Sequence, residues 1–319
     1  MSGRSVDEYR APLFLAWQLT NRCGARCITC CEESGPDKAW GDELRHDEAL
    51  DLARRIAAFG IAYVAFGGGE PLGVPHCWEL LELLAEANVA LKIETDGSRI
   101  DADAADRLSA LDVQCVQISV DGATEATHQR VRPGSSFNAA IQAIERLAAR
   151  GRAPQLVFVP TVFNIHEIVA AFDLAAALGC SAFVTGPLMR IGRAAADWQR
   201  IACSDEQWRH AVAALQERAA STRSGIALSI YPWDIVTEME TRLEQPQAML
   251  LVVPNGKIKL LNALPFAPAD LRHDSLEDAW QAYRNSWRAP EVRAFVARCR
   301  VDPEFLRHAN ETWAMPARR

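Results

Sequence analysis

Four cysteines lie within nine residues near the start of the chain, in the stretch NRCGARCITCC. Three of them, Cys23, Cys27 and Cys30, have the spacing C-x3-C-x2-C. Three thiolates can hold three irons of a 4Fe-4S cubane and leave the fourth iron open to a substrate or cofactor. A zinc site completed by His46 or Cys31, or a chance cluster of thiols, is the alternative. Cys31 lies outside the spacing and is expected to be a small, buried apolar residue.

The cysteines follow the first of six apolar runs that are expected to form parallel strands. These runs cover residues 13–20, 61–67, 89–95, 113–121, 155–162 and 181–186. Amphipathic segments with helical spacing separate them. Right-handed crossovers place each strand beside the preceding one, so the alternation predicts an α/β fold with a partial (β/α)6 TIM-like barrel. The cysteines then lie on a loop at the carboxyl end of a barrel strand, where such barrels carry their sites.

The alternation of strands and helices stops after Arg193. Residues 204–222 are predicted to form a helix and residues 225–230 a strand. The stretch MLLVVPNGKIKLLN is predicted to form a β-hairpin with its turn at Pro-Asn-Gly. We therefore expect three parts, which are an N-terminal lead-in at 1–12, a barrel at 13–200 and a small α+β C-terminal extension at 201–319.

Composition narrows the class of protein. The chain has 319 residues, is 49% hydrophobic and carries a net charge of -7. It has no basic stripe that would bind nucleic acid. It also has no apolar run of about 18 residues that would span a membrane, and its N-terminal residues are too polar for a signal peptide. We expect a cytoplasmic protein, and in a reducing compartment clustered cysteines indicate metal or redox chemistry rather than disulfides.

The end of the second predicted strand supplies a further motif. It reads FGGGEPL and contains Gly68, Gly69, Glu70 and Pro71. With the cysteine spacing, this Gly-Gly-Glu-Pro element resembles the radical S-adenosylmethionine (SAM) superfamily, over roughly residues 13–193. The resemblance implies one 4Fe-4S cluster at the three cysteines and a SAM amino group bound at this element. Glycines permit close approach to a ligand, and a carboxylate complements an ammonium group.

Two later strand ends also resemble the family. Thr95 lies in ETDGS, and Ser119 and Asp121 lie in QISVDG, where relatives contact the ribose or methionine part of SAM. Arg132 in HQRVRPGSSF resembles an arginine that could clamp the SAM carboxylate by bidentate pairing, although a solvated surface arginine is the alternative. Thr29 departs from the pattern, because many relatives have an aromatic residue there.

The C-terminal region resembles a SPASM or twitch domain that lacks its auxiliary-cluster cysteines. The predicted hairpin ends in Asn262, and only Cys299 follows it. Since a second cubane needs three or four thiolates, we expect a single cluster, with the scaffold kept as a lid.

The resemblance implies that the reduced cluster passes one electron, from an external donor such as flavodoxin or ferredoxin, to SAM. The resulting 5'-deoxyadenosyl radical abstracts hydrogen from the substrate. We expect a small natural-product intermediate, such as a sugar, nucleoside or amino-acid derivative, that undergoes epimerisation, fragmentation, decarboxylation or rearrangement. The alternative is a maturase that cross-links or epimerises a ribosomally synthesised peptide. Because the first predicted strand begins only about a dozen residues into the sequence, we expect no appended peptide-recognition domain, which favours the small substrate, although a separate recognition protein could supply that function. A non-catalytic iron-sulfur or zinc protein is disfavoured, because it needs no SAM pocket.

Several residues near the last strand end or in the predicted lid are candidates for substrate contact. They are Arg190, Arg193, Trp233 and Asn262. Arginines at a barrel mouth suit a substrate carboxylate or phosphate. An epimerisation would need a thiol hydrogen donor, for which the candidates are Cys180, Cys203 and Cys299.

Overall fold

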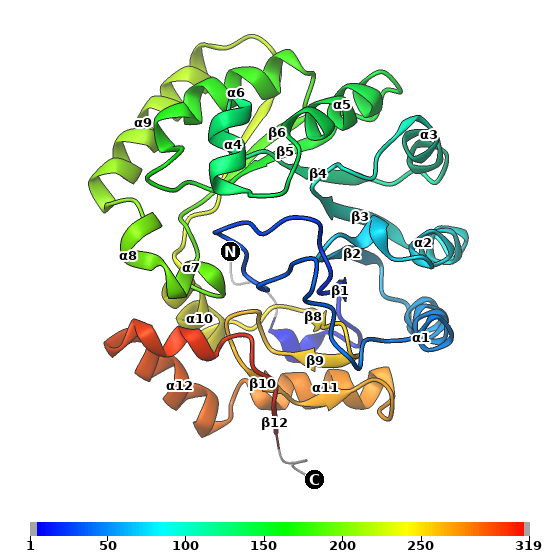
Figure 1. Cartoon of the computed structure of the whole chain (residues 1–319). Coiled ribbons are helices and arrows are strands. Elements are labelled where there is room, and N and C mark those ends of the chain that lie inside the picture. The colour runs from blue at the N-terminus through cyan, green and yellow to red at the C-terminus, as the bar shows by residue number, and fades with distance from the viewer. Residues whose placement is uncertain (1–4, 316–319) are drawn as a thin grey trace.

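The computed structural model describes residues 5–315, and its centre is one curved sheet (Figure 1). Seven parallel strands lie in chain order: β1 (Phe14–Thr20), β2 (Tyr63–Gly68), β3 (Ala90–Thr95), β4 (Cys115–Ser119), β5 (Gln155–Phe158), β6 (Ala182–Thr185) and β7 (Ala227–Ile230). The predicted α/β fold with a parallel, partial barrel sheet is confirmed.

Side chains alternate along the strands between the outer, helix-covered face and the inner face. On β1, Leu15 and Leu19 are buried, whereas Ala16 and Gln18 line an inner cavity. The period of two follows from the pleat of a strand. The inner face can therefore carry polar side chains without disturbing the apolar core between the sheet and the helices.

Helices follow the strands, and the longer ones cover the outer face of the sheet (Figure 1). They are α1 (His46–Phe59), α2 (Cys77–Glu86), α3 (Ala102–Ala110), α5 (Phe137–Ala148), α6 (Ile168–Ala177) and α9 (Asp205–Ser221). Three short helices lie in the connections after β4 and β6: α4 (Glu125–Val131), α7 (Arg193–Ala196) and α8 (Trp198–Ile201). Within residues 5–315, no helix is long and apolar enough to cross a lipid bilayer.

The C-terminal residues extend the same sheet at its other edge. β8 (Met249–Val252) pairs with β1, and β9 (Lys257–Lys259) and β11 (Ala269–Asp270) continue from it. The predicted hairpin turn is present, with Gly256 in the left-handed conformation at φ 82°. The boundary expected at residue 200 therefore does not separate two sheets.

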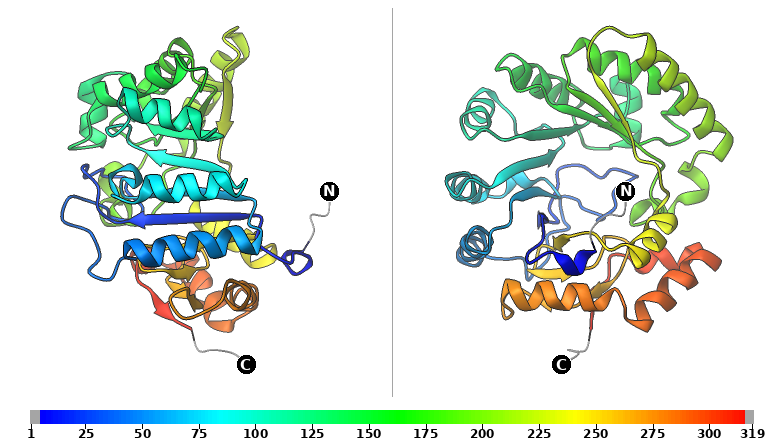
Figure 2. Two further views of the ribbon diagram at one scale, coloured as in Figure 1. Left: turned by 90° about the vertical axis from the view of Figure 1, so that its right-hand side faces the viewer. Right: turned by 180° about the vertical axis from the view of Figure 1, so that it is seen from behind.

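The remaining C-terminal elements pack beside this edge, and α11 lies next to α1 (Figure 2). They are α10 (Ile235–Glu244), α11 (Leu276–Ser286), α12 (Pro290–Val301), the 3-10 helix η4 (Pro303–His308) and a small pair, β10 (Phe266–Ala267) and β12 (Trp313–Ala314). Residues 1–4 of the expected lead-in and residues 316–319 of the expected extension lie outside the described residues.

Candidate functional site

The three cysteines lie on the loop that follows β1, of which residues 21–35 are called the cluster loop below. Its backbone is fixed by other loops at the same end of the barrel. The amide of Arg26 donates to Pro133 O at 2.7 Å, and the amide of Ile28 donates to Val131 O at 2.9 Å. The loop after β1 is thereby held against the segment after α4.

A cavity of about 180 Å³ brings together most of the residues predicted to form the site. The predicted residues that line it are Cys23, Cys27, Cys30, Gly68, Gly69, Thr95, Ser119, Arg132 and Arg193. Glu70, Pro71 and Asp121 do not line this cavity. Asp96 lines it but was not predicted as a site residue, although it directly follows Thr95 in the sequence.

The Gly-Gly pair is required by the close approach of β2 to the cluster loop. The amide of Gly69 donates to Thr20 O at 2.7 Å, and the amide of Glu70 donates to Arg22 O at 2.9 Å. A Cβ on Gly69 would lie 2.0 Å from the carbonyl oxygen of Arg22. These glycines therefore set the position of the backbone directly before Cys23.

The carboxylate of Glu70 joins the turns that follow β2 and β3. It is 5% exposed and accepts hydrogen bonds from the Thr95 hydroxyl at 2.8 Å and from the Asp96 amide at 3.0 Å. It also accepts a bond from the Leu72 amide at 3.2 Å. Burial and the nearby Asp96 raise the pKa of Glu70 to about 8. The carboxylate predicted to face a SAM ammonium group thus has partners in its own chain.

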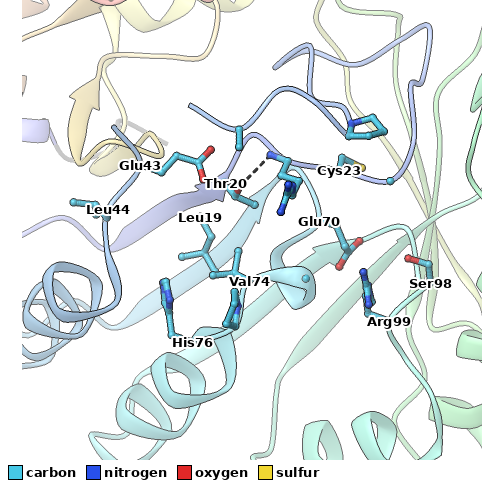
Figure 3. Close-up of a pocket in the computed structure, with 16 residues that line it drawn as sticks. Leu19, Thr20, Cys23, Glu43, Leu44, Glu70, Val74, His76, Ser98 and Arg99 are labelled. Carbon is cyan, nitrogen blue, oxygen red and sulfur yellow. Dashed lines mark hydrogen bonds between the residues drawn. The ribbon is translucent and has the colours of Figure 1, made fainter. Parts of the chain in front are cut away.

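Glu70 and Cys23 also line a second cavity of about 550 Å³, on the other side of the first turn of the cluster loop. In Figure 3, Leu44 and His76 lie on one side of this outer cavity, and Cys23, Glu70, Ser98 and Arg99 lie on the other.

Arg132 and Asp121 form a buried ion pair next to Cys27. Arg132 Nη1 lies 3.0 Å from Asp121 Oδ2, and Asp121 Oδ1 accepts from the Val159 amide at 2.6 Å. The Arg132 side chain is 13% exposed, so it is not the solvated surface residue that was the alternative. Its buried Nε has no hydrogen-bond partner within the described chain. Asp121 therefore orients the guanidinium of a residue that lines the cluster cavity.

His128, on α4, contacts both Asp121 and the segment that follows α4. It is fully buried, its Nδ1 accepts from the Asp121 amide at 3.3 Å, and its Nε2 lies 3.2 Å from Ser135 Oγ. Burial and the charge of Arg132 lower the pKa of His128 to about 4. The ring is therefore neutral at pH 7.

This shift predicts a loss of stability in mild acid. The unfolded chain binds the proton near pH 6.5 and the folded chain only near pH 4, so folded-state stability falls as the pH drops through this window. Between pH 7.5 and pH 5, His128 is expected to cost about 2 kcal/mol of unfolding free energy. The variant His128→Asn keeps an acceptor near the position of Nδ1 but has no imidazole to protonate. Its unfolding free energy, measured by urea titration, should therefore lack this loss of about 2 kcal/mol between pH 7.5 and pH 5. The exposed His210→Asn is the control, and an unchanged pH dependence in His128→Asn would contradict the assignment.

The two arginines expected to contact substrate have other partners. Arg193 Nε donates to Cys27 O at 2.6 Å, and Arg193 Nη2 donates to Ser34 O at 2.8 Å, so this side chain holds the cluster loop. Arg190 forms an ion pair with Glu304. Arg193 also lines the cluster cavity, so a contact with substrate stays a prediction for this residue.

Asn262 does line a cavity, in the lumen of the barrel. This lumen cavity has a volume of about 400 Å³ and also contacts Gln18, Tyr231 and Met249. Trp233 is not among its lining residues and instead packs against Tyr231, with ring centroids 5.9 Å apart.

The lumen cavity and the cluster cavity are neighbours. Both are lined by Gly68, Glu32 and Glu94. Glu32 accepts from Gln18 Nε2 at 3.2 Å, and Glu94 pairs with Lys92 at 2.7 Å. A molecule in the lumen would therefore lie next to the cavity that the three cysteines line.

The three predicted ligand cysteines of the cluster loop are partly or fully buried, and this affects the pKa of their thiols. Burial raises the pKa of Cys23 to about 12 and also raises the pKa of Cys27 and Cys30. In residues 5–315, no three His, Cys, Asp or Glu side chains converge on one metal-ion position. A cubane binds each thiolate through a different iron, so it needs no such convergence.

The thiols that are candidates for hydrogen donation line neither the cluster cavity nor the lumen cavity. They are Cys180, Cys203 and Cys299.

Comparison with known proteins identifies the family. A family model described as the radical SAM superfamily matches residues 17–175. The chain is 36% identical over 203 residues to the mycofactocin maturase MftC of Mycobacterium ulcerans, which is 62% of this chain and 54% of that protein. The chain belongs to the radical SAM superfamily.

Proteins similar to this radical SAM chain also include a heme synthase and a protein crystallised with a precursor peptide. The chain is 31% identical over 200 residues to the AdoMet-dependent heme synthase of Methanosarcina barkeri, which covers 60% of this chain and 57% of that protein. The fold is similar to that of Streptococcus suis SuiB bound to the precursor peptide SuiA, with a TM-score of 0.69, 13% identity and coverage of 86% of this chain and 66% of SuiB. The aligned part of the chain spans about half the length of the relatives it matches.

The family uses a 4Fe-4S cluster and SAM, and SuiB has been crystallised with bound SAM. The residues of this site fit both groups. Three thiols line one cavity, and thiolates are the usual ligands of iron-sulfur clusters. The unpaired Nε of Arg132 offers a buried donor that an anionic group would satisfy.

Proposed function

We propose that the chain is a radical SAM enzyme that modifies a peptide substrate held in the barrel lumen. When bound, the 4Fe-4S cluster supplies the electron that cleaves SAM to methionine and a 5'-deoxyadenosyl radical. The observation that carries the proposal is the adjacency of the cavities, because the lumen cavity and the cysteine-lined cavity share Gly68, Glu32 and Glu94. Hydrogen abstraction requires the substrate carbon to lie beside the site where SAM is cleaved.

Each side chain has a role that follows from its position. Cys23, Cys27 and Cys30 would hold the cluster. Arg132, oriented by Asp121, would bind the SAM carboxylate through a charge-assisted hydrogen bond. The Gly-Gly turn and the carboxylate of Glu70 hold the loops that shape the pocket, while Ser119 and Thr95 would line the SAM site.

A peptide substrate is supported better than the small natural-product intermediate expected from the sequence. The support comes from the likeness to the maturase MftC and from the structure of SuiB bound to a precursor peptide. The lumen cavity also shares Phe14, Gln247 and Met249 with a further cavity beside the lead-in. This succession of three cavities offers room for an extended substrate. An external protein, such as flavodoxin or ferredoxin, would deliver the electron.

The small-molecule reading keeps one supporting observation, which is the likeness to a heme synthase. The proposed scaffold without an auxiliary cluster is common to both readings. Among the described residues after Asn262, Cys299 is the only cysteine, and it is fully buried in α12.

The test begins with anaerobic reconstitution with iron and sulfide. About four irons per chain, an EPR signal of the reduced protein that changes on addition of SAM, and formation of 5'-deoxyadenosine are expected for one cluster. About eight irons would indicate a second cluster and contradict the single-cluster assignment. Zinc, without a response to SAM, would overturn the function.

The substrate class is then tested with a cell extract. The source organism is grown in heavy water, and its extract is separated by size into a peptide fraction and a fraction of small molecules. Hydrogen abstraction from a deuterated substrate places deuterium in 5'-deoxyadenosine, which mass spectrometry detects. Deuterium transfer from the peptide fraction supports the proposal. Transfer only from the fraction of small molecules would contradict it and restore the natural-product reading. Protease treatment of the peptide fraction is the control and should abolish the transfer.

A further inference from the structure

The turn that follows the third cysteine is held by a residue from the far end of the chain. Asn310 Nδ2 donates to the carbonyl oxygen of Cys31 at 2.8 Å and to Glu33 Oε2 at 2.9 Å. Asn310 and Cys31 are 279 residues apart in the sequence. Because its two acceptors flank Glu32, a single amide group fixes both sides of the turn.

This turn has a conformation that needs external support. Glu33 has φ 57°, in the left-handed region that residues other than glycine rarely adopt. Such a conformation persists where the surrounding contacts determine it. Its hydrogen bond to Asn310 is a contact of that kind.

The other side of the same turn is packed against the loop after β6. A Cβ on Gly192 would lie 2.3 Å from Cys31 O and 2.4 Å from Cys30 O. The amide of Arg193 also donates to Cys30 O at 3.1 Å. The cluster loop is therefore enclosed between the barrel and the C-terminal segment.

Asn310 itself has a defined position. The preceding residue, Ala309, is fully buried, and its carbonyl oxygen accepts a hydrogen bond from the ammonium group of Lys259. Lys259 is only 4% exposed. Nearby, the ion pair between Arg190 and Glu304 joins η4 to the loop after β6. The amide of Asn310 is thus presented to the cluster loop by a fixed backbone.

We propose that Asn310 is a positioning residue for the iron-sulfur cluster. It holds the turn at residues 31–33 and, through the backbone, the adjacent ligand Cys30 in the geometry that closes the cluster cavity. The C-terminal extension acts on the cluster in this way without supplying a ligand of its own. The inference rests on the proposed cluster at the three cysteines.

The test compares full-length Asn310→Ala and Asn310→Asp with wild type after anaerobic reconstitution. Loss of one or two hydrogen bonds to the turn is expected to speed iron release to a chelator by about tenfold in Asn310→Ala. Asn310→Asp should release iron faster still, because its carboxylate would face the Glu33 carboxylate and the Cys31 carbonyl. The EPR signal of the reduced cluster should also change. The exposed Asn285→Ala, on α11, is the matched control and should behave as wild type.

Two further measurements separate positioning from general stability. Hydrogen-deuterium exchange of the iron-free protein should show faster exchange at residues 30–35 in Asn310→Ala, with α5 and α6 unchanged. Glycine adopts the left-handed conformation freely. Asn310→Ala should therefore raise the rates of iron release and of exchange at residues 30–35 by a smaller factor in a Glu33→Gly background than in the wild-type background.

Wild-type rates of iron release and of exchange at residues 30–35 in Asn310→Ala would overturn the inference. Wild-type protein that takes up no iron would instead overturn the proposed function, and the exchange measurement would still decide whether Asn310 holds the turn.

Discussion

The Cys27→Ala variant is expected to retain no more than about one-tenth of the wild-type iron after anaerobic reconstitution, because two thiolates leave two irons of a cubane without protein ligands. Cys27 is 7% exposed and lines the cluster cavity, so solvent or another side chain does not readily replace it. Formation of 5'-deoxyadenosine should fall below detection. Iron and sulfide assays and chromatography of the reaction products measure both effects.

Cys31→Ala is the matched control for this variant. Cys31 is next to Cys30 in the sequence, but it does not line the cluster cavity, and it contacts Asn310 through its carbonyl oxygen, which alanine keeps. Its iron content and SAM cleavage are expected to equal those of wild type. Equal loss in Cys27→Ala and Cys31→Ala would mean that the cluster uses a different set of thiols.

Features that depend on local sequence were predictable. The six barrel strands follow from runs of apolar residues, and the hairpin turn at residues 254–256 follows from the preference of Asn-Gly for left-handed conformations. The three cysteines could be proposed as cluster ligands because they lie within eight residues of one loop. In each case the residues that determine the feature are neighbours in the chain.

Partners distant in the sequence were not predictable. The guanidinium of Arg193 donates to Cys27 O and Ser34 O, which lie 166 and 159 residues earlier in the chain, and no sequence pattern indicates these two bonds. Nothing in the sequence near Asn310 indicates that its amide reaches Cys31. The role of a long polar side chain depends on which carbonyls the fold brings within reach, and that depends on the packing of whole elements.

The Gly-Gly-Glu-Pro element combines a motif that could be predicted from the sequence with contacts that could not. Its glycines were expected to allow a ligand to approach, and the structure shows that they allow the cluster loop itself to approach. Glu70 is predicted to meet an ammonium group, and its carboxyl group also accepts hydrogen bonds from Thr95 and Asp96. The element therefore joins the first three strand ends.

Gly69→Ala is accordingly expected to damage the site although it removes no cluster ligand. The new Cβ would lie 2.0 Å from the carbonyl oxygen and 2.6 Å from the carbonyl carbon of Arg22, so backbone must move. Overpacking of this kind costs about 2 kcal/mol, which corresponds to a decrease in Tm of roughly 5 °C. Because Arg22 precedes Cys23, the displacement should also lower the iron content several-fold. Differential scanning fluorimetry and iron assays measure the two effects.

Gly24→Ala tests whether the effect depends on this contact rather than on any loss of glycine near the cluster. Gly24 directly follows Cys23, but a Cβ there would meet no atom within 4 Å. We expect wild-type iron content and a Tm within about 1 °C of wild type, since a substitution without new contacts changes stability little. If Gly69→Ala bound iron as well as Gly24→Ala does, the approach of β2 to Arg22 would not set the position of Cys23. The Gly-Gly pair would then be needed for the ligand and not for the loop that holds the cluster.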